Sequence, residues 1–139
     1  MPSTLVCDSG VVYAALDQRD SRHSQCAALL EAAAGRIVIP TLAVVEIGWL
    51  GQTRGRMDAA ERLLTSVDDG TILLVDLDTY DYRRIRDLLG RYADLPLDIV
   101  DASVVTVAER LEETTIATLD RRHFSVVKPV HCEAFTLVP

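Results

Sequence analysis

Acidic residues stand at the ends of two short apolar segments of this sequence. Asp8 follows Leu-Val-Cys at residues 5–7, and Asp120 follows Ile-Ala-Thr-Leu at residues 116–119. In an open parallel sheet, ligands and catalytic groups gather at the carboxyl ends of the strands. Two strands that each carry an aspartate to the same edge predict a metal site, and we expect the first strand to lie in the middle of the sheet.

Glu46 is a carboxylate inside an otherwise apolar helical segment, residues 44–50. The residues that share its predicted stripe are apolar and indicate a face turned toward the core: Leu42, Val45 and Trp49. A buried carboxylate without a partner costs several kcal/mol. The fold must therefore supply a cation here, either a metal ion or an arginine such as Arg54 or Arg56.

Asp98 and Asp101 open another predicted helix. Their spacing also fits a capping box, in which Asp98 is the N-cap and Asp101 reaches back to the Asp98 backbone N–H. Asp8 and Asp120 fit the role of helix caps as well. Each acid on its own therefore has a purely structural explanation.

Taken together, the acids indicate more than capping. Carboxylates about 5 Å apart repel each other by roughly 3 kcal/mol per pair at an effective dielectric constant near 20. Four of them at one edge of a sheet would oppose folding unless a divalent cation compensated their charge. Hard carboxylate oxygens select Mg²⁺ or Mn²⁺ over zinc.

Short apolar runs alternate with amphipathic segments along the chain. The predicted strands are residues 4–8, 36–40, 71–75, 115–120 and 134–138. The predicted helices are residues 11–16, 21–34 with Ser21 as cap, 41–51, 57–67 with Leu64 inward, 78–92 and 99–111. This alternation predicts one α/β domain over residues 1–139, a three-layer α/β/α sandwich with a central parallel sheet of four to five strands.

Composition and charge limit the class of protein. The first residues lack a secretory signal, and no apolar stretch is long enough to span a membrane. Three unpaired cysteines, Cys7, Cys26 and Cys132, indicate buried free thiols in a reducing cytoplasm. The net charge of −7 argues against an ordinary nucleic-acid binder. However, most of the cationic residues are arginines, which suit bidentate phosphate contacts.

The acids and their surroundings resemble a PIN domain, and more narrowly the VapC-type ribonuclease toxins of bacterial toxin–antitoxin pairs. The resemblance rests on Asp8 after an apolar strand, Glu46 in an apolar helix, Leu-Asp-Ile-Val-Asp-Ala at residues 97–102 and Thr-Leu-Asp-Arg-Arg-His-Phe at residues 118–124. It covers the whole chain. It implies a PIN-like fold and an endoribonuclease that uses Mg²⁺ or Mn²⁺ to activate water.

By this resemblance, the catalytic and metal-binding acids are Asp8, Glu46, Asp101 and Asp120. Asp98 is implied as an accessory metal-binding acid, and Thr118 as a polar helper near the metal.

The resemblance also implies partners. They are a structured RNA substrate such as tRNA or rRNA, a second copy of the chain in a homodimer, and a cognate antitoxin that inserts a segment into an apolar groove. The sequence departs from the family at Gly10, where a small hydroxyl residue is usual, and Ser9 stands beside it.

Two other classes stay open. A noncatalytic module of the same fold would use its acidic edge to bind a basic protein, although the presence of all four acids counts against it. A Mg²⁺-dependent phosphotransfer domain also places aspartates at strand ends. Here Asp8 lacks a second aspartate two residues later, and the only lysine, Lys128, does not end the late strand.

For two further sets of polar residues, the sequence is compatible with both a structural and a functional role. The histidines are isolated in sequence, and we interpret them as surface or packing residues: His23, His123 and His131. Four arginines are candidates for phosphate contacts, and solvent-exposed charge explains them equally well: Arg19, Arg22, Arg121 and Arg122.

Overall fold

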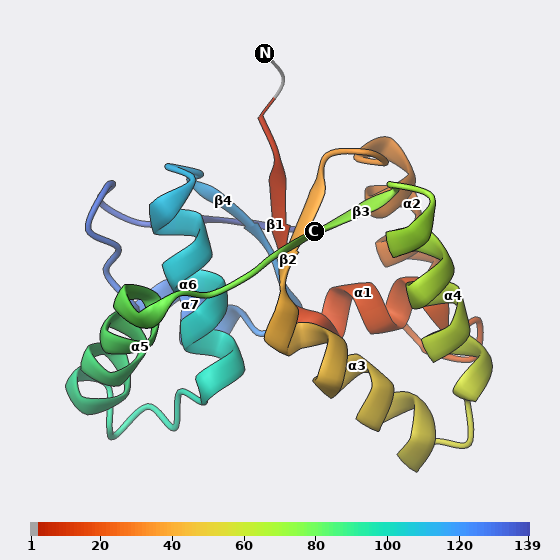
Figure 1. Ribbon diagram of the computed structural model, residues 1–139, viewed down its shortest axis with the longest axis horizontal. Helices are drawn as coiled ribbons and strands as arrows, with labels where there is room; N and C mark the ends of the chain where they lie inside the picture. The colour runs from red at the N-terminus through yellow and green to blue at the C-terminus, as the bar shows by residue number, and fades with distance from the viewer. Residues whose placement is uncertain (1–2) are drawn as a thin grey trace.

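The computed structural model describes residues 3–139 and contains a five-stranded parallel sheet (Figure 1). The strands are β1 (Leu5–Cys7), β2 (Ile37–Pro40), β3 (Ile72–Val75), β4 (Thr115–Ala117) and β5 (Thr136–Val138). The helices are α1 (Ser9–Leu16), α2 (His23–Ala32), α3 (Thr41–Thr53), α4 (Met57–Asp68), α5 (Thr79–Arg91), α6 (Ile99–Arg110) and α7 (Arg121–Val126). The predicted alternation of strands and helices is confirmed.

The sheet has the strand order β3-β2-β1-β4-β5, and every neighbouring pair is parallel. The first strand is therefore central, as predicted. Cys7 pairs with Ala117, so β1 and β4 end at the same level. The residues that follow these two strands in sequence are brought together at this edge.

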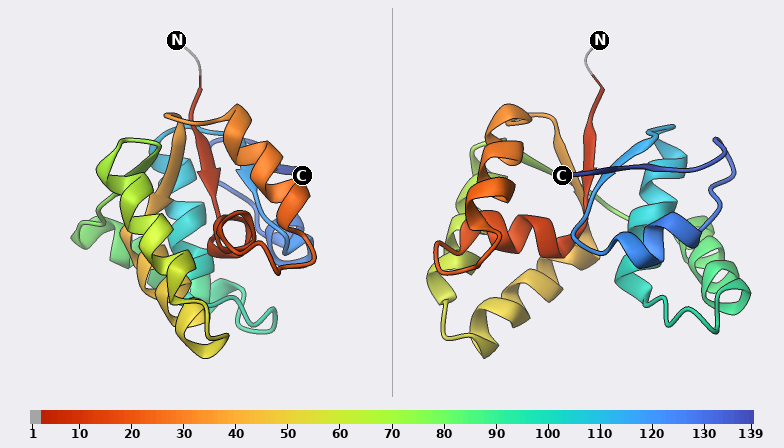
Figure 2. Two further views of the ribbon diagram at one scale, coloured as in Figure 1. Left: turned by 90° about the vertical axis from the view of Figure 1, so that its right-hand side faces the viewer. Right: turned by 180° about the vertical axis from the view of Figure 1, so that it is seen from behind.

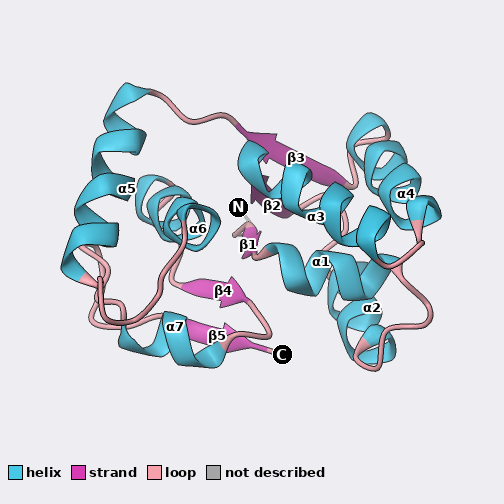
Figure 3. Ribbon diagram, turned by 90° about the horizontal axis from the view of Figure 1, so that it is seen from below, coloured by secondary structure: helices cyan, strands magenta, loops and turns pink. Residues whose placement is uncertain are grey.

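Helices cover both faces of the sheet, which confirms the three-layer prediction. Helices α1 to α4 lie on one side and α5 to α7 on the other (Figure 3). Figure 2 shows the same two groups from behind, with β1 between them. Successive residues of a strand point to opposite faces, and accordingly Leu5 and Cys7 belong to one core cluster while Val6 belongs to the other.

The predicted inward face of α3 is wrong. Val45 and Trp49 are 73% and 60% exposed, and the buried residues are Ala43, Ile47 and Gly51. At one end of this buried face α3 approaches the turn before α4 closely, and a Cβ on Gly51 would lie 2.9 Å from the Arg56 carbonyl oxygen. The packed face combines Ala43 and Gly51 with the fully buried Ile47, whereas Val45 and Trp49 point outward.

Smaller differences concern element ends and single side chains. Helix α2 begins at His23 without a side-chain cap, so Ser21 is not its N-cap. Leu64 is exposed on α4 rather than inward. Cys7 and Cys26 are buried free thiols as predicted, whereas Cys132 is only half-buried. Among the described residues, no helix has the length and hydrophobicity to cross a membrane.

Candidate functional site

Asp8 lies at the centre of the sheet edge, and each of its two carboxylate oxygens accepts a hydrogen bond. It is buried and is the N-cap of α1. The Ser9 backbone N–H donates to Asp8 Oδ1 at 2.8 Å, and the Thr118 hydroxyl donates to Asp8 Oδ2 at 3.1 Å. Since Thr118 follows β4, the two central strands jointly hold this carboxylate.

Asp98 and Asp101 form the predicted capping box at the start of α6. The Asp101 backbone N–H donates to Asp98 Oδ1 at 2.8 Å, and the Asp98 N–H donates to Asp101 Oδ2 at 3.2 Å. Asp98 is exposed, whereas Asp101 is buried and turned toward the sheet edge. Capping and membership of the acid cluster are therefore not alternatives for Asp101.

Glu46 reaches the same edge from α3. The Ser9 hydroxyl donates to Glu46 Oε1, and it also lies 3.4 Å from Asp8 Oδ1. Neither predicted arginine partner contacts Glu46 in the described structure: Arg54 pairs with Asp20, and Arg56 pairs with Asp17 and Asp58. The interpretation of Glu46 as one half of an arginine ion pair is therefore wrong, although its side chain is only half-buried.

Asp120 follows β4 and is the N-cap of α7. Its backbone N–H donates to the Thr118 hydroxyl at 2.9 Å, so Thr118 links Asp120 to Asp8. The ring Nδ1 of His123 lies 2.6 Å from Asp120 Oδ2 and 3.5 Å from Asp101 Oδ2. The structure thus brings all five predicted acids to one edge of the sheet.

Burial changes the acidity of two of these carboxyls. Burial raises the pKa of Asp8 to about 6; hydrogen bonds from Ser9 and Thr118 oppose the rise, and the charge of Glu46 adds to it. Burial and the charges of Asp8 and Asp98 raise the pKa of Asp101 to about 8. Each ionised carboxylate therefore makes the others harder to ionise, and a bound cation would relieve this repulsion.

The donor chemistry of the cluster fits a hard divalent cation. The acids supply carboxylate oxygens, and none of the arginine ion pairs found in residues 3–139 includes any of them. Within the same residues, no three His, Cys, Asp or Glu side chains form a compact ligand set on their own.

Two residues of this edge were not assigned to the site from the sequence. Ser9 bridges Asp8 and Glu46, and His123, interpreted as a packing residue, contacts two of the acids. The signal for His123 was its position three residues after Asp120 at the start of a helix. That spacing places a side chain over the N-cap.

The predicted phosphate-binding arginines differ in their surroundings. Arg121 donates to the backbone carbonyls of Leu137 and Pro139, so its guanidinium is engaged at the end of the chain. Arg22 donates to Gln25. Arg19 and Arg122 are exposed, which leaves them as the better candidates.

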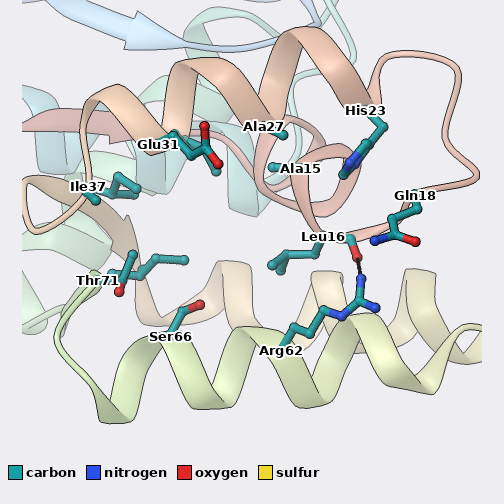
Figure 4. A pocket seen from close by; sticks show the side chains of 13 residues that line it. Ala15, Leu16, Gln18, His23, Ala27, Glu31, Ile37, Arg62, Ser66 and Thr71 are labelled. Carbon is teal, nitrogen blue, oxygen red and sulfur yellow. Dashed lines mark hydrogen bonds between the residues drawn. The ribbon is translucent and has the colours of Figure 1, made fainter.

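Two hollows lie near the helices. One, of about 400 Å³, is lined by apolar residues and by Glu46: Leu42, Val45, Trp49, Ile99 and Val100. The other, of about 450 Å³, lies between α2 and α4 and contains none of the five acids (Figure 4). There Arg62 donates to the Leu16 carbonyl oxygen at 2.9 Å. Of these two, only the first is lined by one of the five acids.

Comparison with known proteins agrees with this arrangement. The chain is 28% identical over 135 residues to a protein named Ribonuclease VapC26 from Mycobacterium tuberculosis, a match that covers 97% of this chain and all of that protein. The crystal structure of Mycobacterium tuberculosis VapC20, described as a Sarcin-Ricin loop cleaving toxin, is similar in fold. Its TM-score is 0.78 at 14% identity, over 85% of this chain and 91% of that one. Residues 5–129 match the PIN domain family, and the chain therefore belongs to that family.

Proposed function

We propose that this chain is the ribonuclease toxin of a toxin–antitoxin pair, a divalent-metal-dependent endonuclease that cuts structured RNA such as tRNA or rRNA. The observation that carries this conclusion is a pair of buried carboxylates, Asp8 and Asp101, at the carboxyl edge of one parallel sheet. Neither has an arginine partner among the ion pairs of residues 3–139. The relatives support the class of activity, since one is named a ribonuclease and the other an RNA-loop-cleaving toxin.

The proposed catalytic acids are Asp8, Glu46, Asp101 and Asp120, and the same residues with Asp98 would hold the metal. Their oxygen donors favour Mg²⁺ or Mn²⁺ over metals that prefer sulfur or nitrogen. Mg²⁺ usually keeps several waters and binds through one or two carboxylates. This preference for water ligands fits the described edge of the sheet, where the acids lie near one another without forming a complete ligand set.

A divalent cation held by these acids would supply an activated water and would stabilise negative charge on the leaving oxygen. The chain's own residues supply position. Thr118 and the Ser9 backbone hold the two oxygens of Asp8, and the Asp98 backbone holds Asp101. The acids act through geometry and charge, and no covalent intermediate with the protein is required.

The proposed protein partners are a cognate antitoxin and a second copy of the chain, and we place the activity in the cytoplasm. The antitoxin suits the apolar hollow beside Glu46. A segment with apolar side chains and one basic residue would bury the apolar lining and neutralise an acid at the same time. Residues 1–139 would act as a single nuclease unit.

The deciding experiment incubates purified protein with total RNA and Mn²⁺ or Mg²⁺, before and after addition of a chelator. We expect cleavage that needs the metal and that is lost in Asp8→Asn and Asp101→Asn. Asp78→Asn is the matched control, because Asp78 caps α5 in the same way but lies outside the acid cluster. Cleavage that persists with chelator and in both site variants would exclude the proposed mechanism.

Mapping the RNA ends that appear after expression in cells would identify the substrate. We expect a small number of cuts within structured regions of tRNA or rRNA. If no RNA is cut while the protein binds a basic protein tightly, a noncatalytic binding module is the better description.

A further inference from the structure

His123 contacts both oxygens of the Asp120 carboxylate. Its backbone N–H donates to Asp120 Oδ1 at 3.2 Å, and its ring Nδ1 lies 2.6 Å from Asp120 Oδ2. The Asp120 side chain is 38% exposed, so packing alone does not fix its orientation. A single residue that engages both oxygens prevents the carboxylate from rotating freely.

The same ring nitrogen lies between acids from two elements. Nδ1 is 3.5 Å from Asp101 Oδ2, and the His123 side chain is only 16% exposed. Nδ1 makes no well-aligned hydrogen bond among the described residues. The ring is therefore held against Asp101 and Asp120 by its packing, with Nδ1 within contact distance of both carboxylates.

His123 is also the only side chain able to carry positive charge that contacts the acid cluster within residues 3–139. The arginine ion pairs of this part of the chain involve other acids: Asp17, Asp20, Asp58, Asp78, Asp81 and Glu109. The fold thus neutralises its structural carboxylates with arginine and places a single imidazole at the candidate site.

We propose that His123 is a positioning residue, which holds Asp120 in the orientation that binds the divalent cation without being a ligand itself. This rests on the proposed metal-dependent function. The imidazole and its two carboxylate neighbours do not form a compact ligand set. Removal of a side chain that contacts a metal ligand and orients it typically lowers the metal affinity by roughly 10–100-fold.

Three variants test the role through the Mn²⁺ dissociation constant, measured by calorimetry on the full chain. We expect His123→Ala and His123→Gln to weaken Mn²⁺ binding roughly tenfold or more. His123→Asn should bind nearly as well as the unaltered protein, because its amide nitrogen can occupy the place of Nδ1 and keep the polar contact with Asp120 Oδ2, whereas the amide of glutamine takes the place of Nε2. The comparison of Mn²⁺ affinity between His123→Asn and His123→Gln tests the positioning role even if His123→Ala folds poorly.

A second measurement asks whether His123 acts through Asp120. In an Asp120→Asn background, His123→Ala should weaken Mn²⁺ binding no further, because the carboxylate that it orients is already gone. Ser125→Ala is the matched control, since Ser125 lies exposed on the same helix. Thermal unfolding followed by circular dichroism checks that each variant is folded.

Electron spin echo spectroscopy of the Mn²⁺-loaded protein separates a positioning residue from a ligand. We expect no ¹⁴N coupling from a coordinated imidazole. A coupling that disappears in His123→Ala, or equal Mn²⁺ affinity with and without the histidine side chain, would overturn the inference. If the unaltered protein bound no Mn²⁺, or bound it equally after Asp8→Asn, the proposed function itself would fail and the inference with it.

Discussion

Four aspartate side chains are buried in the described part of this chain: Asp8, Asp17, Asp81 and Asp101. Asp17 lies 3.3 Å from Arg56, and Asp81 lies 2.5 Å from Arg110. The other two have no arginine partner among the ion pairs found in residues 3–139. Burial without an arginine partner disfavours the ionised form, and the pKa of both Asp8 and Asp101 is raised accordingly. A bound divalent cation would stabilise the ionised form of both carboxyls.

Replacing Asp101 by asparagine should therefore separate stability from activity. Asp101→Asn removes a carboxyl whose pKa is raised by burial and by the neighbouring acids. We expect RNA cleavage to fall at least roughly 100-fold, the scale seen when a preorganised charge in an active site is removed. We also expect the metal-free variant to resist urea better than the unaltered protein at pH 8. If Asp101→Asn lowered both the rate of RNA cleavage and the free energy of unfolding, the role of Asp101 would instead be structural.

The stability of the metal-free protein should fall as the pH rises from 4 to 8. Because burial raises the pKa of Asp8 from its usual value near 3.8 to about 6, the folded state binds more protons than the unfolded state in this range. The free energy of unfolding therefore decreases with pH, by on the order of 3 kcal/mol for Asp8 alone once the pH exceeds 6. Urea unfolding in chelator at several pH values measures the slope.

The double variant Asp8→Asn, Asp101→Asn is the control for this pH dependence. It lacks both carboxyls whose pKa is raised, so its stability should change less over the same pH range. The same slope in both proteins would show that other groups cause the effect.

At the scale of elements, two helices begin with the same capping motif, but the motif has a different role in each. Helices α5 and α6 both start with a capping box of two aspartates, Asp78 with Asp81 and Asp98 with Asp101. In α5 the second acid contacts Arg110, whereas in α6 it faces the other acids. One local pattern can thus be a purely structural cap or part of a site, according to what lies opposite.

This pair of caps allows a controlled comparison. Both Asp78→Ala and Asp98→Ala should lower the free energy of unfolding by about 1 kcal/mol, the usual value of a helix N-cap. Only Asp98→Ala should also reduce RNA cleavage, because it removes the carboxylate that accepts from the Asp101 backbone N–H and that belongs to the acid cluster. Chemical denaturation and the RNA assay on the same two samples test this. Equal loss of cleavage in both variants would show that activity follows stability alone.

Two glycines of α3 should respond to alanine in opposite directions. A Cβ at Gly48 meets nothing within 4 Å, so Gly48→Ala should stabilise the protein by roughly 0.5–1 kcal/mol through helix propensity. A Cβ at Gly51 would lie 2.9 Å from the Arg56 carbonyl oxygen, so Gly51→Ala should cost about 1–3 kcal/mol. Thermal unfolding of both variants measures the difference. Destabilisation of both would place the cause in the packing of α3 as a whole.

At the scale of the whole molecule, the candidate site joins residues from α1, α3, α6 and the segment after β4. A cation that binds all of them only when they are assembled should stabilise the folded state. At a concentration 100 times its dissociation constant the expected gain is about 2.7 kcal/mol. The melting temperature should therefore rise by several degrees with Mn²⁺ and not in Asp8→Asn, Asp101→Asn. A rise of equal size in that variant would place the metal elsewhere.

Much of this assembly was predictable, because it follows from local sequence. The Asp98–Asp101 box and the acids after β1 and β4 are dictated by short segments, and the parallel order follows from strands that alternate with helices. The face of α3 was not predictable in this way. Val45 and Trp49 looked like core residues, but the helix packs through Ala43, Ile47 and Gly51 and leaves them exposed.

The amino-acid sequence by itself determined which carboxylates end the strands, which of them cap helices, and that the strands run parallel, since these depend on neighbours a few residues away. Only the tertiary structure decided that Ser9 links Asp8 to Glu46 and that His123 lies between Asp101 and Asp120. It also decided which buried acids meet an arginine. Such contacts join segments far apart in the chain, and their geometry depends on how helices pack across the sheet, which no local pattern encodes.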